Sequence, residues 1–374
     1  MTMRYKCMTE LNSVLEKALS FERINDEELL CLLEEKEKGQ DIIRIAGIKN
    51  QKINFDRVSY VVNRNINFTN ICGLNCRFCG YKRTKKSKDS FLLDYDKILE
   101  KISEGKKIGI DEICVTGGIN PELKPDYYFS LIKTVRDNFP DLHIHAFSPQ
   151  EIYELSKATN KSYEDVILKL ADTGLNSMPG TAAEILAKET RSKICPEKIN
   201  TDIWVEIIKA AHKSGVKTSA TILFGHIESN PDIVYHLSLI RQIQDETNGF
   251  TEFIALPFIS YKTSLRKRVD SALMQDKVFR FYAILRLYLD NFKNIQTSWP
   301  KIGILAALKS LECGVNDFGG TLMEENITKS AGGEFGEYLP EDEIISLIKK
   351  SGKFPVRRDT LYNRIYEKTY ENRY

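Results

Sequence analysis

Three cysteines stand close together in the stretch "NFTNICGLNCRFCGYKR", residues 67–83. They are Cys72, Cys76 and Cys79, spaced C-x3-C-x2-C. Closely spaced thiolates can hold zinc or an iron–sulfur cluster. Structural zinc usually needs four ligands, often from two C-x2-C pairs, whereas this loop has one such pair. A four-iron cluster held by only three cysteines would leave its fourth iron open to another ligand. An incomplete zinc site and a chance grouping are the alternatives.

The composition is that of a globular protein. The chain has 374 residues, of which 42% are hydrophobic and 28% are charged. A net charge of +2 gives no electrostatic case for nucleic acid as a partner. No apolar run is long enough to span a membrane, and the first residues lack the apolar core of a signal peptide. These features predict a cytoplasmic protein without a disulfide framework.

From about residue 56, short β-prone segments alternate with amphipathic helical stretches. This alternation predicts an α/β fold, a (β/α)8 TIM-type barrel, with an open doubly wound sheet as the alternative. The expected strands are 58–68, 111–118, 142–148, 174–180, 216–225, 250–258, 294–299 and 314–320. The expected helices between them are 94–107, 125–138, 162–172, 199–213, 231–246, 272–291 and 300–312.

The chain outside this alternation is expected to form two extensions. Residues 1–50 are predicted to form an N-terminal helical extension, with Asn25 or Asp26 as a helix cap. Residues 51–340 form the predicted barrel. Residues 341–374 are predicted to form a C-terminal helical extension that packs on the barrel.

Glycines and polar residues gather where the expected strands end. Barrel enzymes place their active sites at this carboxyl-terminal face. The cysteine loop follows the first expected strand, so it should lie at the same face. The other residues at these ends are Gly117, Gly118, Ser148, Gly180, Gly225, His226, Trp299, Asn316 and Asp317.

The cysteine spacing, with the aromatic Phe78 before the last cysteine, resembles the signature of the radical S-adenosylmethionine (radical SAM) superfamily. The resemblance implies a [4Fe-4S] cluster on the three cysteines and S-adenosylmethionine as a second cofactor. The amino and carboxylate groups of the cofactor's methionine would chelate the open iron. Electron transfer from the cluster would then cleave the sulfonium and yield a 5′-deoxyadenosyl radical.

Further motifs resemble a narrower family, the FO synthase and futalosine-pathway (menaquinone) radical enzymes. They run in order from "HIHAFSPQEI" (143–152) through "PGTAAEIL" (179–186) and "IQTSWPKIG" (295–303) to "NDFGGTLMEENITKSAG" (316–332). The resemblance spans roughly residues 50–360 and is strongest to the FO synthase component. Gly80 and Ala255 depart from the family pattern, which usually has Ala and Pro there.

The resemblance implies a radical transferase of deazaflavin biosynthesis. It would cleave the Cα–Cβ bond of L-tyrosine and join the 4-hydroxybenzyl group to 5-amino-6-(D-ribitylamino)uracil, releasing 2-iminoacetate. The alternatives are aminofutalosine synthase, dehypoxanthine futalosine cyclase and a non-enzymatic zinc or iron–sulfur protein. Expected partners are an electron donor such as ferredoxin or flavodoxin and a separate ring-closing radical SAM subunit.

Several residues are candidates for holding the cofactor. Gly117 and Gly118 would let the backbone approach the methionine amino group. Glu184 and Arg191 are seven residues apart, which predicts one face of a helix. Arg191 suits the methionine carboxylate and Glu184 the ribose hydroxyls. Ser148 and Gln150 are further candidates; a surface salt bridge between Glu184 and Arg191 is the alternative.

Other residues are candidates for the substrates. His145 and His226 could contact substrate or transfer a proton, although a histidine in a strand is more often a satisfied core residue. Glu228 could hold a substrate amino group. The remaining candidates are Trp299 as a cavity wall, and Asn316 with Asp317 as readers of the uracil edge or ribityl hydroxyls. An Asx turn is the simpler explanation of this last pair.

Overall fold

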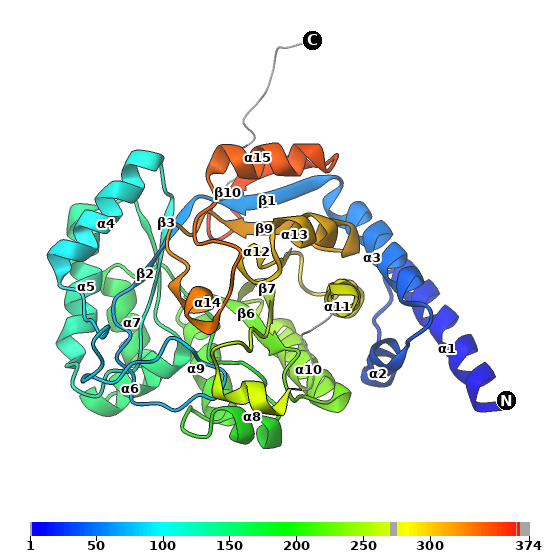
Figure 1. Ribbon diagram of the computed structural model, residues 1–374, viewed down its shortest axis with the longest axis horizontal. Coiled ribbons are helices and arrows are strands. Elements are labelled where there is room, and N and C mark those ends of the chain that lie inside the picture. Colours follow the sequence, from blue (N-terminus) through cyan, green and yellow to red (C-terminus); the bar gives the residue numbers. More distant parts are fainter. Residues whose placement is uncertain (1, 270–274, 364, 367–374) are drawn as a thin grey trace, which may run out of the picture.

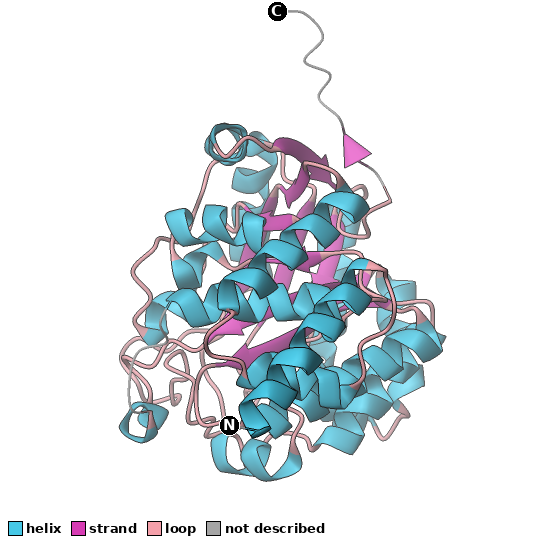
Figure 2. Cartoon of the chain, turned by 90° about the vertical axis from the view of Figure 1, so that its right-hand side faces the viewer, coloured by secondary structure: helices cyan, strands magenta, loops and turns pink. Residues whose placement is uncertain are grey.

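The computed structural model describes residues 2–269, 275–363 and 365–366. It shows a curled β-sheet enclosed by helices (Figures 1 and 2). The strand order is β11-β10-β1-β9-β8-β7-β6-β5-β4-β3-β2, and all described neighbours pair in parallel except β10 and β11. The described strands are β1 (Arg57–Val61), β2 (Asn63–Asn67), β3 (Glu112–Thr116), β4 (His143–Ala146), β5 (Ser177–Met178), β6 (Lys217–Phe224), β7 (Phe250–Pro257), β8 (Ile295–Gln296), β9 (Asp317–Gly320), β10 (Phe354–Arg358) and β11 (Ile365–Tyr366).

The curled sheet closes through one continuous stretch of chain, residues 57–67, which pairs with strands from both ends of the strand order. β1 and β2 follow each other with only Val62 between them. β1 pairs with β9 and β10, while β2 pairs with β3. The expectation of an α/β, TIM-like fold is therefore confirmed, and each expected strand overlaps a described one.

Helices connect successive parallel strands, as right-handed crossovers require. Most expected helices are present within a few residues of their predicted bounds. The helices of this region are α4 (Tyr95–Ile108), α5 (Pro125–Asn138), α6 (Pro149–Thr159), α7 (Tyr163–Thr173), α8 (Lys188–Ile194), α9 (Thr201–Lys213), α10 (Asn230–Thr247), α11 (Gln275–Tyr288), α12 (Trp299–Ile302), α13 (Ile304–Ser310) and α14 (Asn326–Ala331), with short 3-10 turns at Ser264–Arg268 and Leu311–Cys313.

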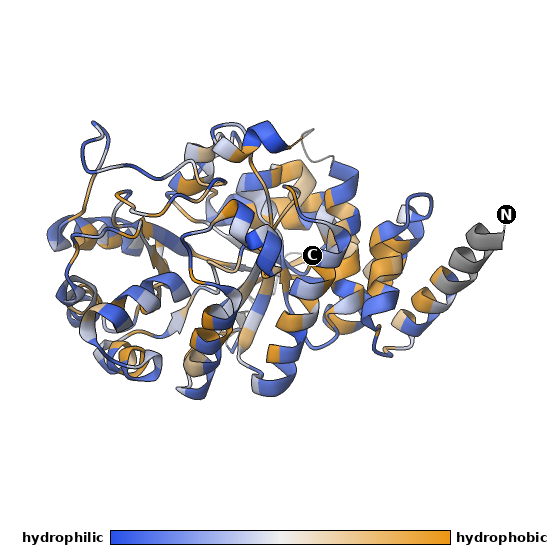
Figure 3. Ribbon diagram, turned by 90° about the horizontal axis from the view of Figure 1, so that it is seen from below, coloured by the Kyte–Doolittle hydropathy of each residue, from blue (hydrophilic) through white to orange (hydrophobic). Residues whose placement is uncertain are grey.

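The hydrophobic core lies between the strands and this helical layer. Strand residues such as Ile113, Val115 and Ile144 are fully buried and belong to one continuous cluster with the helices. Hydrophobic residues lie mostly on the inner sides of the helices and hydrophilic residues on their outer sides (Figure 3). Burial of apolar surface at about 25 cal/mol per Å² therefore fixes the helices against the outside of the sheet.

Three helices precede the sheet. They are α1 (Thr2–Leu19), α2 (Asp26–Glu34) and α3 (Gly39–Asn54). Asn25 caps α2: its side chain accepts from the Glu28 amide, and the Glu28 carboxylate accepts from the Asn25 amide. The helices extend away from the barrel on the side of α11 (Figure 1), against which α3 packs.

The C-terminal segment is not wholly helical, which corrects the expectation for this region. α15 (Glu341–Lys350) is a helix, but the chain then forms β10, which pairs in parallel with β1. Because Val356 and Arg358 are buried, β10 is an integral strand of the sheet and not a tail on the surface.

Candidate active site

The cysteine loop lies directly after β2, at the carboxyl ends of the parallel strands. The three thiols are half-buried and form no disulfide. Backbone hydrogen bonds shape the loop: the Cys72 amide donates to the Arg83 carbonyl at 3.0 Å, and the Cys79 amide donates to the Cys76 carbonyl at 3.1 Å. The thiols are thus held in one loop while the backbone satisfies its own hydrogen bonds.

Segments far apart in the sequence fix this loop. The Arg77 amide donates to the Ile194 carbonyl of α8 at 2.8 Å, and the Arg77 carbonyl accepts from the Leu265 amide at 2.9 Å. The carboxylate of Glu197 accepts from both the amide and the side chain of Asn75. The position of the thiols therefore depends on the folded barrel.

The two glycines after β3 pack closely on the segment that carries the cysteines. A Cβ atom on Gly118 would lie 2.3 Å from the Ile71 carbonyl oxygen and 3.0 Å from Cβ of Cys72. A Cβ atom on Gly117 would lie 2.5 Å from the Phe68 ring. Glycine is required at both positions because the neighbouring chain leaves no room for a side chain.

The donor set fits a thiolate-bound cluster better than a single ion. Among the described residues, no group of three or more His, Cys, Asp and Glu side chains is gathered so that it could hold one metal ion. A cluster of several irons spreads its thiolate ligands over different metal atoms, so they need not converge on one point. Burial raises the pKa of the Cys76 thiol to about 12, so binding of a metal would displace a proton there.

Ser148 and Gln150 begin α6 beside the glycines. The Ser148 hydroxyl accepts from the Glu151 amide and the Glu151 carboxylate accepts from the Ser148 amide, forming a capping box; a Glu151 oxygen also accepts from the Gly117 amide at 3.3 Å. Gln150 accepts from the Ile199 amide and donates to Glu154. Burial raises the pKa of Glu151 to about 7. Glu151 was not among the residues predicted from the sequence, although the S-x-x-E pattern is the signature of such a cap.

Glu184 and Arg191 do not share a helix, which corrects that expectation. α8 begins only at Lys188, and Glu184 lies before it with φ at 51°. All three guanidinium nitrogens of Arg191 donate to backbone carbonyls, including those of Ala182, Ala183 and Ile199. Arg191 therefore holds the 182–199 turn together, and these carbonyl groups occupy its donors.

Lys198 is a further charged residue beside the cysteines. Its ammonium lies 2.5 Å from a Glu184 oxygen and 5.4 Å from the centre of the Phe78 ring. Burial opposes the charge, but the Glu184 and Cys76 groups raise the pKa of Lys198 above its ordinary value. The pair places a fixed cation near the thiols. No local sequence pattern predicted the pairing of Lys198 with Glu184.

The two histidines and Glu228 make local hydrogen bonds. Nδ1 of His145 lies 2.7 Å from the Ser177 hydroxyl, and burial lowers the pKa of this histidine to about 4, so it is neutral near pH 7. His226 contacts the Leu223 carbonyl and the Ile227 amide. Glu228 accepts from the amides of the turn after β6. The structure brings two of the three groups together: Nδ1 of His226 lies 3.0 Å from a Glu228 carboxylate oxygen, whereas His145 bonds to Ser177.

Asn316 and Asp317 lie at the opposite end of the barrel from the cysteines, which corrects their expected position. Asp317 begins β9 and does not end it. Its carboxylate accepts from Arg358 at 2.5 Å, and Asn316 accepts from Arg286 at 2.6 Å. Trp299, after β8, is buried and donates to the Gly320 carbonyl at 2.9 Å.

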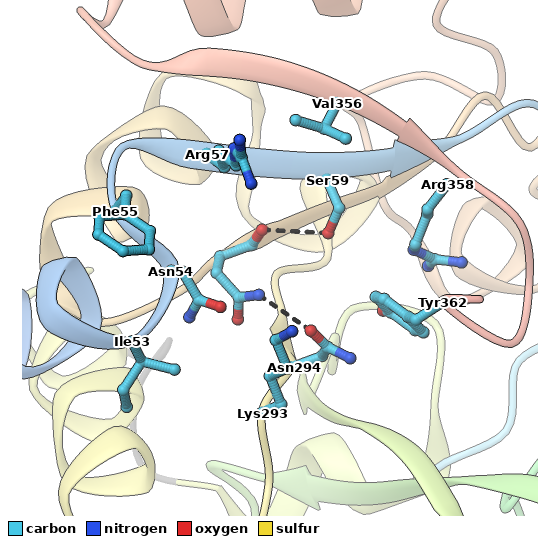
Figure 4. Close-up of a pocket in the computed structure, with 11 residues that line it drawn as sticks. Ile53, Asn54, Phe55, Arg57, Ser59, Lys293, Asn294, Val356, Arg358 and Tyr362 are labelled. Carbon is cyan, nitrogen blue, oxygen red and sulfur yellow. Dashed lines mark hydrogen bonds between the residues drawn. The ribbon is translucent and has the colours of Figure 1, made fainter. Parts of the chain in front are cut away.

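A pocket opens at this amino end, away from the cysteine loop. Figure 4 shows residues that line it, among them Ser59 of β1, Asn294 before β8 and Arg358 of β10. Asn294 accepts from the Asn316 side chain, and Ser59 donates to the Asn316 carbonyl. Because this pocket lies at the end of the barrel opposite the thiols, it is separate from the cofactor site.

Some side chains on the inner face of the sheet remain partly accessible to solvent, although helices enclose the sheet. Cys114 and Thr116 of β3, and Ile254 and Leu256 of β7, are partly exposed, whereas the alternate residues are buried against the helices. Burial raises the pKa of the Cys114 thiol, and carboxyl groups that include Glu112 and, from β7, Glu252 act in the same direction. Because β3 and β7 are not neighbours in the sheet, these side chains face one shared interior.

The sequence matches two known protein families. Residues 66–240 match the radical SAM superfamily, and residues 247–370 match the CofH/MqnC C-terminal region. The solved HydG structure, a maturase of FeFe-hydrogenase from Carboxydothermus hydrogenoformans, has a TM-score of 0.72 at 16% identity, covering 96% of this chain and 81% of that one. At this identity the likeness shows the fold.

Two relatives carry the same name, 5-amino-6-(D-ribitylamino)uracil–L-tyrosine 4-hydroxyphenyl transferase. The relative from Methanococcus vannielii is 42% identical, over 91% of this chain and 97% of its own length. The relative from Archaeoglobus fulgidus is 45% identical, over 86% of this chain and 93% of its own length. No described helix is long and apolar enough to cross a bilayer.

Proposed function

Since the chain belongs to the radical SAM family of 5-amino-6-(D-ribitylamino)uracil–L-tyrosine 4-hydroxyphenyl transferases, we propose that it performs this transfer in deazaflavin biosynthesis. The Cα–Cβ bond of L-tyrosine breaks, the 4-hydroxybenzyl group joins C5 of the ribitylaminouracil, and the remainder leaves as 2-iminoacetate. The observation that carries this proposal is the loop of three free cysteines at the carboxyl edge of the barrel.

Cys72, Cys76 and Cys79 would hold a [4Fe-4S] cluster. With S-adenosylmethionine bound, the cluster supplies a 5′-deoxyadenosyl radical that can abstract hydrogen from the substrate. The backbone of Gly117 and Gly118, packed against the segment that carries the cysteines, is the candidate contact for the amino group of the cofactor's methionine. Glu184, held by Lys198, is the candidate for the ribose hydroxyls, with Ser148 and Gln150 lining the same edge.

The enclosed interior of the sheet would receive the substrates. Its partly exposed inner side chains lie below the cysteine loop and exclude bulk water from a reacting radical. His145 is the candidate substrate contact from β4, and Trp299 would wall the site after β8. His226 and Glu228 would act through the turn after β6, which their hydrogen bonds shape.

We also propose that the strands form a (β/α)8 barrel with an extension at each end of the chain. If β1 and β2 are taken as one strand, β3 to β9 complete a (β/α)8 barrel. Residues 51–340 would form this catalytic unit, with residues 1–50 and 341–374 as extensions. A small redox protein such as ferredoxin or flavodoxin would supply the electron in the cytoplasm, and a second radical enzyme would close the deazaflavin ring.

The test is anaerobic reconstitution of the full chain with iron and sulfide, followed by reductant, S-adenosylmethionine, L-tyrosine and the ribitylaminouracil. We expect 5′-deoxyadenosine and a 4-hydroxybenzyl adduct of the uracil, both detected by mass spectrometry. Omission of either substrate should remove the adduct. Formation of 5′-deoxyadenosine without any consumption of L-tyrosine or the uracil would refute the substrate assignment.

A further inference from the structure

Basic residues gather on two segments beside the cysteines. Residues 75–88 hold six basic residues and no acidic one, and residues 261–268, after β7, hold four basic residues and no acidic one. The chain as a whole is almost balanced, with 54 basic and 52 acidic residues, so this excess is local. The two segments together are called the basic rim. Its basic residues are Arg77, Lys82, Arg83, Lys85, Lys86, Lys88, Lys262, Arg266, Lys267 and Arg268.

Hydrogen bonds hold both segments of the basic rim against the cysteine loop. Arg77 stands between the second and third cysteines, and its carbonyl accepts from the Leu265 amide at 2.9 Å and from the Ser264 hydroxyl at 3.1 Å. At the other flank of the loop, the Arg83 carbonyl accepts from the Cys72 amide at 3.0 Å. The backbone that carries these cations is therefore fixed beside the thiols by the folded chain.

Several exposed cations of the basic rim have no carboxylate partner within the described part of the chain. They are Lys86, Lys88, Lys262, Lys267 and Arg268. Elsewhere on the surface, exposed lysines pair with carboxylates of the chain itself, as Lys133 does with Asp137 at 2.9 Å. Neighbouring cations that are not compensated in this way create a positive potential, which attracts a partner of opposite charge.

An exposed aromatic ring adds an apolar contact to the basic rim. Tyr261 exposes 61% of its surface. The Arg266 guanidinium lies 4.7 Å from the centre of its ring, and a Cβ atom on Gly332 would lie 2.8 Å from Cβ of Tyr261. These contacts hold the side chain at its base while most of its surface stays open. Tyrosine and arginine are enriched where protein partners bind most strongly, so the rim suits a protein more than a small ion.

Resting on the proposed function, we propose that the basic rim docks a small acidic redox protein that delivers an electron to the cysteine loop. The proposed reaction needs an electron for each cleavage of S-adenosylmethionine. Electron transfer slows steeply with distance, so the donor must dock beside the three cysteines, where the basic rim lies. The electron leaves the donor, which is oxidised, and enters the cluster, which is reduced, and no bond forms or breaks. Opposite charge steers the donor to this surface and orients it there.

The test measures binding of the oxidised donor, which needs no turnover. An acidic flavodoxin and an acidic ferredoxin are the probes, each titrated anaerobically into the cluster-loaded full chain by calorimetry. At low salt, the double variant Lys267→Glu, Arg268→Glu should bind the probe about 10-fold or more weakly than the native chain does. The native affinity should fall as salt is added, because salt screens exposed charges. A carbodiimide should cross-link Lys86 or Lys262 to carboxylates of the bound probe, located by mass spectrometry.

The matched control is Lys106→Glu with Lys107→Glu, the same change of charge at the exposed end of α4. Because α4 leads into the start of β3, this pair lies at the opposite edge of the barrel from the cysteines. The control should keep the native affinity within about twofold, since salt screens charges that far from the docked probe. An excess of dithionite should give the same amount of 5′-deoxyadenosine in all three chains.

Three results would overturn the docking surface: unchanged affinity in the rim variant, an equal loss of affinity in the control, or a native chain that binds neither probe. Tighter binding of a single-stranded RNA than of either protein would also overturn it. A chain that binds a probe through the basic rim and forms 5′-deoxyadenosine, but yields no adduct from L-tyrosine, would instead refute the proposed transfer and leave the docking surface standing.

Discussion

Polar side chains at the carboxyl edge differ in whether the protein already satisfies their hydrogen bonds. The guanidinium of Arg191, the amide of Gln150 and the carboxylate of Glu228 are occupied by backbone groups or neighbouring side chains. The thiols of the cysteine loop form no disulfide and retain capacity for a ligand. This difference, more than residue type, separates positions that shape the site from positions that can bind.

A single cysteine substitution should remove the cluster. Cys76→Ser replaces a soft thiolate with a hydroxyl that binds iron weakly. We expect the iron content after reconstitution to fall, and 5′-deoxyadenosine formation to fall by more than about 100-fold, because even supporting residues of metal sites cost 10–100-fold. Cys31→Ser, on α2 and remote from the loop, is the control and should keep both. Full iron loading in Cys76→Ser would contradict the ligand assignment.

Glu252 should make stability depend on pH. Burial raises the pKa of Glu252 from 4.5 to about 7. Between these values the native state holds a proton that the unfolded state has lost, so stability falls as pH rises through this window. The total loss is about 3 kcal/mol at 1.36 kcal/mol per unit. Glu252→Gln cannot ionise and should flatten the fall in the free energy of unfolding between pH 5 and 8.

Chemical denaturation at several pH values measures this slope. The control is Glu206→Gln, the same change at an exposed position of α9, which should keep the native pH dependence. An unchanged slope in Glu252→Gln would show that this carboxyl group does not hold its proton near neutral pH.

At the scale of elements, the end of β3 and the cysteine loop are packed as one unit. In Gly118→Ala the new methyl would meet the Ile71 carbonyl at 2.3 Å and force the loop to move. We expect reduced iron loading and lower 5′-deoxyadenosine formation, with the fold retained by circular dichroism. Gly39→Ala, where a Cβ meets only the flexible end of Arg280 at 3.5 Å, should be neutral. Normal loading in Gly118→Ala would mean that the loop tolerates the shift.

The sequence predicted the strands and most helices because their alternation of apolar patterns is local. The cysteine ligands were also predictable, since their spacing lies within one loop. The position of Asp317 was not, because a strand's start and end look alike when the next turn is rich in glycine. The pairing of Lys198 with Glu184 and the carbonyl contacts of Arg191 depend on how a long irregular turn folds back, which no periodicity reports. β10 was missed because its residues, FPVRR, do not alternate between apolar and polar side chains and include a proline, which argues against a strand.

At the scale of the whole molecule, the two ends of the barrel serve different purposes. The carboxyl end carries the cysteine loop and an accessible interior. The amino end is closed by buried polar contacts from the C-terminal segment. Thr360 donates to Glu112, Tyr362 donates to Asp317 at 2.8 Å, and Arg358 pairs with Asp317.

The Arg358–Asp317 pair should therefore contribute strongly to global stability. Both side chains are buried, with 4% and 0% of their surface exposed. Arg358→Met leaves the Asp317 carboxylate enclosed without its cation, which should lower the free energy of unfolding by about 3–5 kcal/mol. Adding Asp317→Asn should recover part of this loss, because the uncompensated charge is then gone. Arg44→Met, which breaks an exposed pair on α3, should change stability by less than about 1 kcal/mol in the same denaturation series. An Arg358→Met chain as stable as the native one would show that β10 lies against the barrel without helping to hold it closed.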